Sequence, residues 1–286
     1  MDKIFSETLE LQRRIRKLEG LPTMPTVLQQ IWDALRDPDC SARRLATAIA
    51  TDPGLTARIL RMSNSAYYGL SRQVSDVTEA TVVLGVEVVK SLAIGSSVVE
   101  GFRQSVPGFD MQRFWQHSVH CAVAAEAVAR TTGGLRPEVA FCSGILHDVG
   151  KLVLAAVLRE DYAQAAASFD AGRDPDWVRW EKETLGADHQ TVGLWVAERW
   201  KFSHELVEVI AFHHRPDRAL SHSRLVTAVC LAESMLDPGH PPILEVDTTT
   251  WDPRWAELLG ADEAVLGILR DQLPARLRAA GSMAGF

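Results

Sequence analysis

Histidines are the residues of this 286-residue chain whose positions suggest chemistry. Imidazole nitrogen and carboxylate oxygen together suit Fe, Mn, Zn or a similar divalent ion. A single histidine on an apolar helix is more often a hydrogen-bonded core residue than a ligand, so only the group points to a metal. The group of interest is His117, His147, Asp148, His189, His213 and His214. No single helix can hold residues so widely spaced, so several helices of a bundle must bring them together.

The elements that must position these residues are all predicted to be helices. Apolar residues recur at three- and four-residue steps along most of the chain, which favours an all-α fold. Turn formers at Pro107 and Gly108 suggest a boundary between two lobes. We therefore expect an N-terminal helix within residues 1–20 and a helical lobe over 21–110. A metal-site lobe over 111–236 and a linker with C-terminal helices over 237–286 complete the prediction.

Individual helices follow from periodicity and from start and stop residues. Asp52 and Pro53 suit the first turn of one helix, since aspartate caps free N–H groups and proline tolerates that position. Residues Val77–Val99, broken at Gly85, superficially resemble a helix-turn-helix, but their apolar side chains favour packing over DNA reading. The remaining expected helices cover 7–18, 26–37, 41–52, 114–131, 138–158, 177–185, 189–200, 204–214, 223–236, 255–259 and 263–279.

Composition excludes several classes of protein. Apolar residues make up 47% and charged residues 23% of the chain, as in ordinary folded proteins, which argues against disorder. The formal charge of −7 argues against general nucleic-acid binding. Four scattered cysteines and the lack of a long uninterrupted apolar stretch predict reduced thiols, no membrane segment and a cytoplasmic location.

Several motifs, in order, resemble one known family. His147-Asp148-Val149-Gly150-Lys151, with Trp115-Gln116-His117-Ser118-Val119 thirty residues earlier, resembles the signature of the HD superfamily of metal-dependent phosphohydrolases. The segments LPTMPTVLQQI, TDPGLTARILRMSNSAYYG, TEATVVLGVEVVKSLAI, GADHQTVGLWVAERW and VEVIAFHH resemble the HDOD subfamily. The similarity covers residues 21–214 and continues more weakly to 236. It implies the all-α fold with an N-terminal helical lobe packed on an HD-like bundle.

The resemblance also implies a ligand set. His117 matches the first histidine, His147 and Asp148 the central pair, and His189 the next histidine. His213 and His214 match the paired histidines of dinuclear relatives. The last expected ligand is an aspartate, but the chain has Glu233, whose extra methylene predicts coordination with altered geometry.

The same relatives imply a metal and two residues with catalytic roles. The expected cofactor is a divalent metal, with Fe or Mn favoured over Zn or Mg. Asp148 would bridge two ions that activate water for attack on phosphorus, and Lys151 would lie near the substrate phosphate. For Lys151, a solvent-exposed helix position is an equal alternative.

Two departures limit the implied activity. The loop after the paired histidines reads RPDRALSHSRL and lacks the Gly-Tyr-Pro sequence of relatives that hydrolyse cyclic dinucleotides. Arg113 stands where trinuclear members carry a glutamate, which opposes a third metal, although it could hold a phosphate or pair with Asp148. Hydrolysis of cyclic di-GMP is therefore disfavoured.

Two functions remain open at the level of sequence. The favoured one is a bacterial signal-transduction regulator of the HDOD type, whose partner is a signalling protein or a small phosphorylated ligand. The alternative is a metal-dependent phosphohydrolase acting on a nucleotide or phosphate ester, because ligand-type residues do not by themselves prove turnover. The sequence leaves the oligomeric state open.

Overall fold

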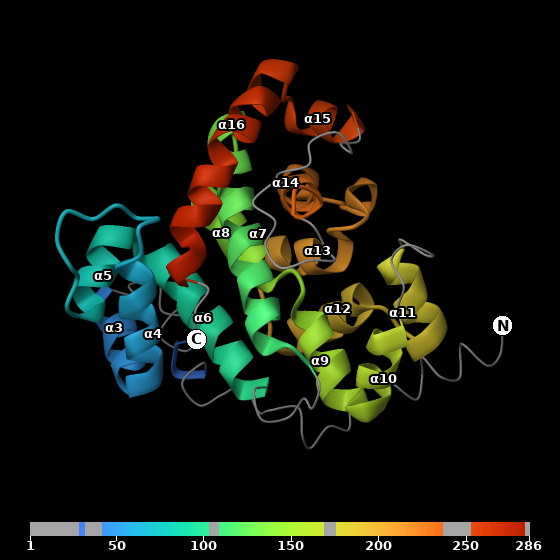
Figure 1. The fold of residues 1–286 in the computed structure, drawn as a ribbon, viewed down its shortest axis with the longest axis horizontal. Coiled ribbons are helices and arrows are strands. Elements are labelled where there is room, and N and C mark those ends of the chain that lie inside the picture. The colour runs from blue at the N-terminus through green and yellow to red at the C-terminus, as the bar shows by residue number, and fades with distance from the viewer. Residues whose placement is uncertain (1–28, 32–41, 103–108, 169–175, 237–252, 284–286) are drawn as a thin grey trace.

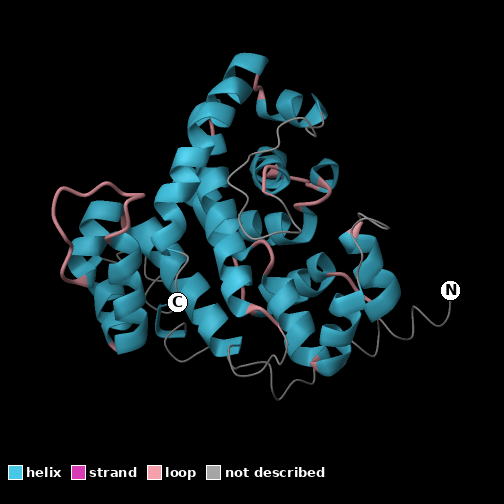
Figure 2. Ribbon diagram, viewed as in Figure 1, coloured by secondary structure: helices cyan, strands magenta, loops and turns pink. Residues whose placement is uncertain are grey.

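The described part of the chain is helical throughout. The computed structural model describes residues 29–31, 42–102, 109–168, 176–236 and 253–283. Every regular element in these ranges is a helix, and no strand occurs among them (Figure 2). The predicted all-α fold is confirmed. The helix predicted over 7–18, most of that over 26–37 and the linker predicted over 238–250 lie outside the described residues.

Helices α3 to α6 form the N-terminal group within residues 42–102 (Figure 1). The Asp52 carboxylate accepts a hydrogen bond from the Leu55 backbone N–H at 3.0 Å, so the predicted N-cap is confirmed. Gly85 separates the last two helices with φ 88°, a conformation that glycine adopts without strain. The group consists of α3 (Ala42–Ala50), α4 (Pro53–Ser63), α5 (Val77–Leu84) and α6 (Val86–Phe102).

The long helix α7 (Met111–Thr132) lies at the centre of the molecule, with α8 (Pro137–Leu146) and α16 (Glu263–Ala280) beside it (Figure 1). Its small side chains allow close packing. A Cβ added to Gly144 of α8 would lie only 2.5 Å from the Ala122 Cα of α7, so the two helices touch through their backbones. Helix α7 therefore has little freedom to shift, and it carries His117.

The remaining helices of the described residues follow α8 in the sequence. Residues 177–185 form a helix with the predicted bounds, whereas residues 160–168 form one that was not predicted. Arg159, with φ 50°, separates that helix from its predecessor. The elements are α9 (Val149–Leu158), α10 (Glu160–Ser168), α11 (Trp177–Leu185), α12 (His189–Arg199), α13 (His204–Phe212), η1 (Pro216–Arg218), α14 (Ser223–Ser234), α15 (Pro253–Leu259) and η2 (Gly281–Met283).

One stretch is long and apolar enough to cross a membrane by length and composition. It covers Pro137–Leu158, and 78% of its most apolar window is buried inside the protein. Burial in the core between α7 and α12 accounts for this composition without a membrane.

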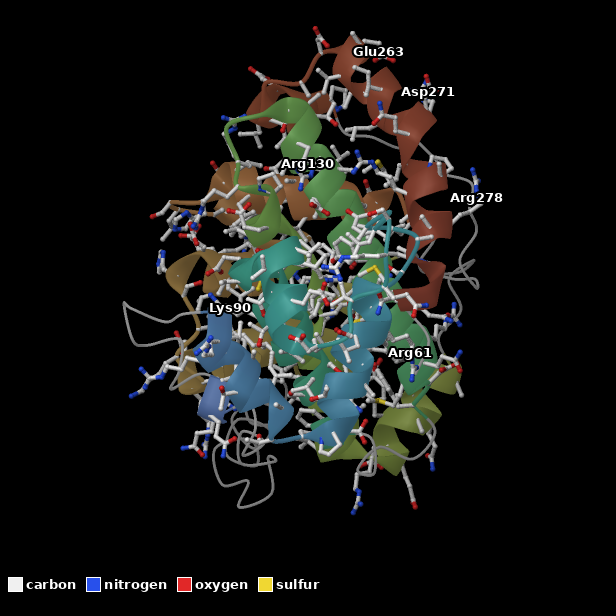
Figure 3. All side chains as sticks on the ribbon, turned by 90° about the vertical axis from the view of Figure 1, so that its left-hand side faces the viewer. Arg61, Lys90, Arg130, Glu263, Asp271 and Arg278 are labelled. Atoms are coloured by element: carbon white, nitrogen blue, oxygen red, sulfur yellow. The ribbon has the colours of Figure 1, made fainter. Side chains whose placement is uncertain are left out.

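A buried polar contact joins the turn after α4 to α7. The Tyr67 hydroxyl donates to a carboxylate oxygen of Glu126, and Arg130, labelled in Figure 3, donates to the other oxygen at 2.6 Å. Tyr67 therefore links the turn after α4 to the central helix. Glu126 is only 6% exposed, so these partners offset the cost of burying its charge.

Candidate metal centre

The site forms where α8 ends and α9 begins. The sequence treats residues 138–158 as one helical stretch, but the structure divides it at His147 and Asp148, which connect the two helices. Both residues are buried, with 0% and 1% exposure. A Cβ added to Gly150 would overlap the His189 carbonyl oxygen, so this glycine allows α9 to lie directly against α12. The central His-Asp pair therefore lies next to the following histidine.

All seven predicted ligand residues converge here, in two groups whose ligand atoms lie within 4.8 Å of one another. In the first, His117 Nε2 lies 3.3 Å from His147 Nε2. In the second, His189 Nε2 lies 3.2 Å from His213 Nε2 and 3.1 Å from His214 Nε2. The first group comprises His117, His147, Asp148 and Glu233, and the second comprises His189, His213 and His214.

Asp148 lies between the two groups and faces both. Its Oδ2 atom is 3.5 Å from His117 Nε2 and 3.4 Å from His147 Nε2. Its Oδ1 atom is 3.5 Å from His189 Nε2 and 3.7 Å from His213 Nε2. Oδ1 is also buried without a hydrogen-bond partner in the described part of the chain. One carboxylate can therefore supply an oxygen to an ion in each group.

Glu233 makes a second connection. Its Oε1 atom lies 3.9 Å from His147 Nε2, and its Oε2 atom lies 3.5 Å from His214 Nδ1. The two carboxylate oxygens therefore lie toward different groups. Glu233 lies at the C-terminal end of α14, and its coordination of a metal stays a prediction.

Backbone hydrogen bonds determine which ring nitrogen faces the cluster in two of the buried histidines. His147 Nδ1 donates to the Gly144 carbonyl oxygen at 2.8 Å, and His213 Nδ1 donates to the Val209 carbonyl oxygen at 3.1 Å. A carbonyl oxygen only accepts, so Nδ1 carries a proton in both rings and Nε2 is the atom that faces the cluster, with a free lone pair whenever the ring is neutral. A divalent cation among these lone pairs and the unpartnered Asp148 oxygen would satisfy them, so the residues fit a metal pair.

Charge in the site is concentrated on buried groups. Lys151 Nζ donates to Asp148 Oδ2 at 2.6 Å. Burial by itself would raise the pKa of Asp148, but Lys151 and His147 hold that pKa well below its usual range. Burial lowers the pKa of His117 to about 4 and that of His189 to about 3. These two imidazoles are neutral at pH 7, as metal ligation requires.

Comparison with known proteins assigns the chain to a family. The family model named HDOD domain matches residues 21–216. The chain belongs to the HDOD domain family. A crystal structure of a Shewanella amazonensis protein, described as a candidate phosphohydrolase, is 28% identical with a TM-score of 0.74 and covers 95% of this chain and 96% of that one.

Two further relatives are more distant. A crystal structure of a Marinobacter aquaeolei protein, described as a candidate signal transduction protein, is 21% identical with a TM-score of 0.78. The alignment covers all of this chain and 67% of that one, and at this identity it shows the fold alone. An uncharacterized Treponema pallidum protein is 24% identical over 236 residues, which are 80% of this chain and 45% of that protein. The chain thus spans less than half the length of this curated relative.

Sequence reasoning missed two residues of the HDOD site. Glu181 of α11 is wholly buried and contacts His189, and burial raises its pKa to about 8 against the lowering effect of Lys151. Its signal in the sequence was Trp177 one helical turn earlier, whose indole N–H donates to it. Cys121 is a buried free thiol, and burial raises its pKa against the lowering effect of the nearby His147. It lies one turn after His117, on the same face of α7.

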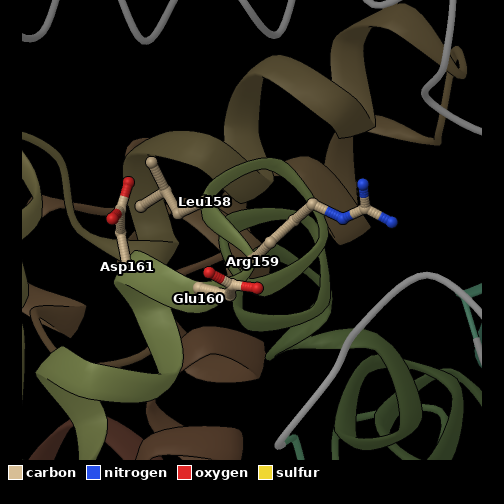
Figure 4. Close-up of a pocket in the computed structure, with 4 residues that line it drawn as sticks. All are labelled: Leu158, Arg159, Glu160 and Asp161. Atoms are coloured by element: carbon tan, nitrogen blue, oxygen red, sulfur yellow. The ribbon is translucent and has the colours of Figure 1, made fainter.

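Other features do not join the centre. Arg113 is exposed, and it is Lys151 that pairs with Asp148. A surface hollow at the junction of α9 and α10 is lined by Leu158, Arg159, Glu160 and Asp161 (Figure 4). It lies at the opposite end of α9 from Asp148, and no histidine is among its described lining residues.

Proposed function

We propose that this HDOD protein is a bacterial signal-transduction regulator with a two-metal centre in its second lobe, formed by residues 111–236. The observation that carries the metal assignment is Asp148, whose two oxygens face separate histidine groups and whose Oδ1 lacks a partner among the described residues. The regulatory role rests on membership of the HDOD family, whose resemblance implies it at the level of sequence. The partner we propose is a signalling protein or a small phosphorylated ligand.

The ligand set favours Fe or Mn over Zn or Mg. Five imidazoles and two carboxylates converge in two groups. Mixed imidazole and carboxylate ligands suit Fe and Mn, whereas Mg prefers oxygen alone. His117, His147, Asp148 and Glu233 would hold one ion. His189, His213 and His214 would hold the other, with Asp148 and Glu233 shared.

Hydrolysis of a phosphate ester or nucleotide is the second candidate function, and partial exposure of three side chains at the site favours it. The side chains of His117, Lys151 and His214 are 22%, 21% and 30% exposed, whereas His147, His189 and His213 are fully buried. A phosphate could approach the exposed part of Lys151, whose ammonium group would attract it. A bound metal pair would supply an activated water and offset the negative charge on phosphate oxygens.

Cyclic di-GMP is not the substrate that we propose. The loop after His214 contains the short helix η1 and lacks the Gly-Tyr-Pro sequence associated with that activity. The residue one turn before His117 is the exposed Arg113, which cannot act as a carboxylate ligand for a third ion. We therefore expect slow turnover at most, on simpler phosphate esters.

The test combines metal analysis with a variant that removes the centre. Protein purified without added metal is analysed for its elements, and the parent is then compared with the His147→Ala/Asp148→Ala variant. Both proteins are assayed with Mn²⁺ on a panel of phosphate esters and nucleotides. Both are also tested for the cellular phenotype. A His204→Ala/Asp217→Ala variant is the control, because both residues are exposed and outside the centre.

The outcomes separate the two functions. If the protein is a regulator, we expect it to bind metal and to produce a phenotype without substantial hydrolysis. Robust metal-dependent hydrolysis that disappears together with the phenotype in the double variant would make the protein an enzyme. Failure of the parent protein to bind Mn²⁺ or Fe²⁺ would overturn the metal centre itself.

A further inference from the structure

Glu181 is a carboxylate held wholly inside the protein beside the proposed centre. Helix α11, which carries it, lies next to α12 (Figure 1). Its Oε1 atom accepts the Trp177 indole N–H at 2.8 Å, and its Oε2 atom accepts the His189 backbone N–H at 2.8 Å. The His189 ring approaches the same oxygen, with Nδ1 at 2.6 Å from Oε2. Two N–H groups and the His189 Nδ1 atom therefore converge on this one carboxyl group.

This arrangement sets His189 apart from the other fully buried histidines. His147 and His213 donate their Nδ1 protons to backbone carbonyl oxygens, at 2.8 Å and 3.1 Å. A carbonyl oxygen is enough to orient an imidazole, and burying a carboxylate costs several kcal/mol unless the charge is compensated. Burial raises the pKa of Glu181 to about 8, but a cation bound by His189 would favour the ionised form, so with an ion bound the carboxylate adds negative charge as well as orientation.

The negative charge of Glu181 lies beside the group of proposed ligands that has no carboxylate of its own. His189, His213 and His214 are uncharged as ligands, and the nearest carboxylates, Asp148 and Glu233, are shared with the first group. Lys151 also neutralises part of the Asp148 charge through its 2.6 Å contact. A carboxylate on the far nitrogen of a ligating histidine fixes its tautomer and increases its basicity toward the metal.

We infer that Glu181 is a positioning residue for the ion held by His189, His213 and His214, an inference that rests on the metal centre of the proposed function. Glu181 keeps the His189 proton on Nδ1, so that Nε2 faces the ion. Its negative charge offsets part of the charge of that ion. The ion held by His117, His147, Asp148 and Glu233 has no such dependence on Glu181.

Glu181→Gln tests this inference with little change in side-chain size. The amide nitrogen is a donor, so glutamine cannot accept all three N–H groups. We expect Mn²⁺ titration calorimetry to show two ions per parent chain, and about 10–100-fold weaker binding of one of them in the variant. Glu208→Gln is the matched control. Glu208 is 3% exposed and accepts backbone N–H groups of Ser221 and His222, at 3.0 Å and 2.9 Å.

A second measurement reports position rather than stability. In ¹⁵N-histidine NMR spectra of the Zn²⁺-loaded parent, we expect the His189 ring to carry its proton on Nδ1. The Glu181→Gln variant should show a shifted or exchanging Nδ1–H signal, while the His147 pattern stays unchanged. Circular dichroism and a thermal melt of the same sample establish that the variant is folded.

Three results would overturn the inference, and they differ from one another. Two ions bound by Glu181→Gln with parental affinity and an unchanged His189 tautomer would overturn it alone. Equal weakening of both ions would show general damage rather than a role at one position. A parent that binds no ion would overturn the proposed function as well.

Discussion

Replacement of Gly150 by alanine tests how closely the packing of α9 against α12 controls the site. A Cβ at this position would overlap the His189 carbonyl oxygen and lie 2.7 Å from the Gly193 amide nitrogen. Ordinary contacts between such atoms are about 3.5 Å, so the helices must separate by more than about 1 Å. The atoms met by the new methyl group are backbone atoms, which cannot rotate away.

The expected change in the free energy of unfolding for Gly150→Ala is the sum of two opposing effects. Overpacking in a well-packed core costs typically about 1–3 kcal/mol, and the rigid neighbours place Gly150→Ala at the upper end. Alanine in a helix gains about 1 kcal/mol over glycine. The net loss is about 2 kcal/mol, which lowers the melting temperature by roughly 4–8 °C in a protein of this size.

The matched control is Gly267→Ala in α16. Nothing lies within 4 Å of a Cβ added there, so only the helix-propensity gain remains. We expect this variant to be about 0.5–1 kcal/mol more stable than the parent. Calorimetric melts with and without Mn²⁺ measure both variants.

The metal content of Gly150→Ala is the functional readout. Separation of α9 from α12 moves Asp148 away from His189, so the ion shared between them should bind at least 10-fold more weakly. An unchanged melting temperature together with unchanged metal binding would refute the reasoning that this glycine sets the distance between the two histidine groups.

Three other predictions follow from the same contacts. Asp148→Ala should lose most bound metal, because its oxygens face both groups, and parental metal content by elemental analysis would contradict the bridging role. Metal-free Glu181→Gln protein should lose stability as pH falls below 6.5, because the unfolded chain binds protons that His189 and His117, with pKa values of about 3 and 4, do not; the substitution removes the opposite effect of Glu181, whose pKa is about 8. The loss is about 1 kcal/mol per pH unit from His189 and less from the partly exposed His117, and equal melting temperatures at pH 7.0 and 5.5 would exclude it. Tyr67→Phe should cost about 1–2 kcal/mol in urea unfolding by removing a hydrogen bond to the buried Glu126, and a change below 0.5 kcal/mol would contradict this.

Local signals in the sequence predicted most helices. The bounds of α11 agree residue for residue, and Asp52 caps α4 as expected. Caps, prolines and apolar periodicity act over a few residues, so their effect is visible in the sequence. Helix α10 was missed because its sequence, EDYAQAAAS, has few large apolar residues to mark a buried face.

The seven candidate ligands were also predicted from the sequence, but through resemblance to a family. Periodicity alone placed His117 and His189 on separate helices and did not predict how far apart they lie. That Glu233 directs one oxygen toward each group, and that Lys151 pairs with Asp148, became visible only in the fold.

The sequence by itself determined the residue types and the helices that carry them, since both depend on short-range interactions. The tertiary structure decided which atoms meet. Glu181 shows the difference, because it lies eight residues before His189 and belongs to another helix. Its role depends on how α11 packs against α12, and long-range packing of this kind is set by the whole core rather than by any local pattern.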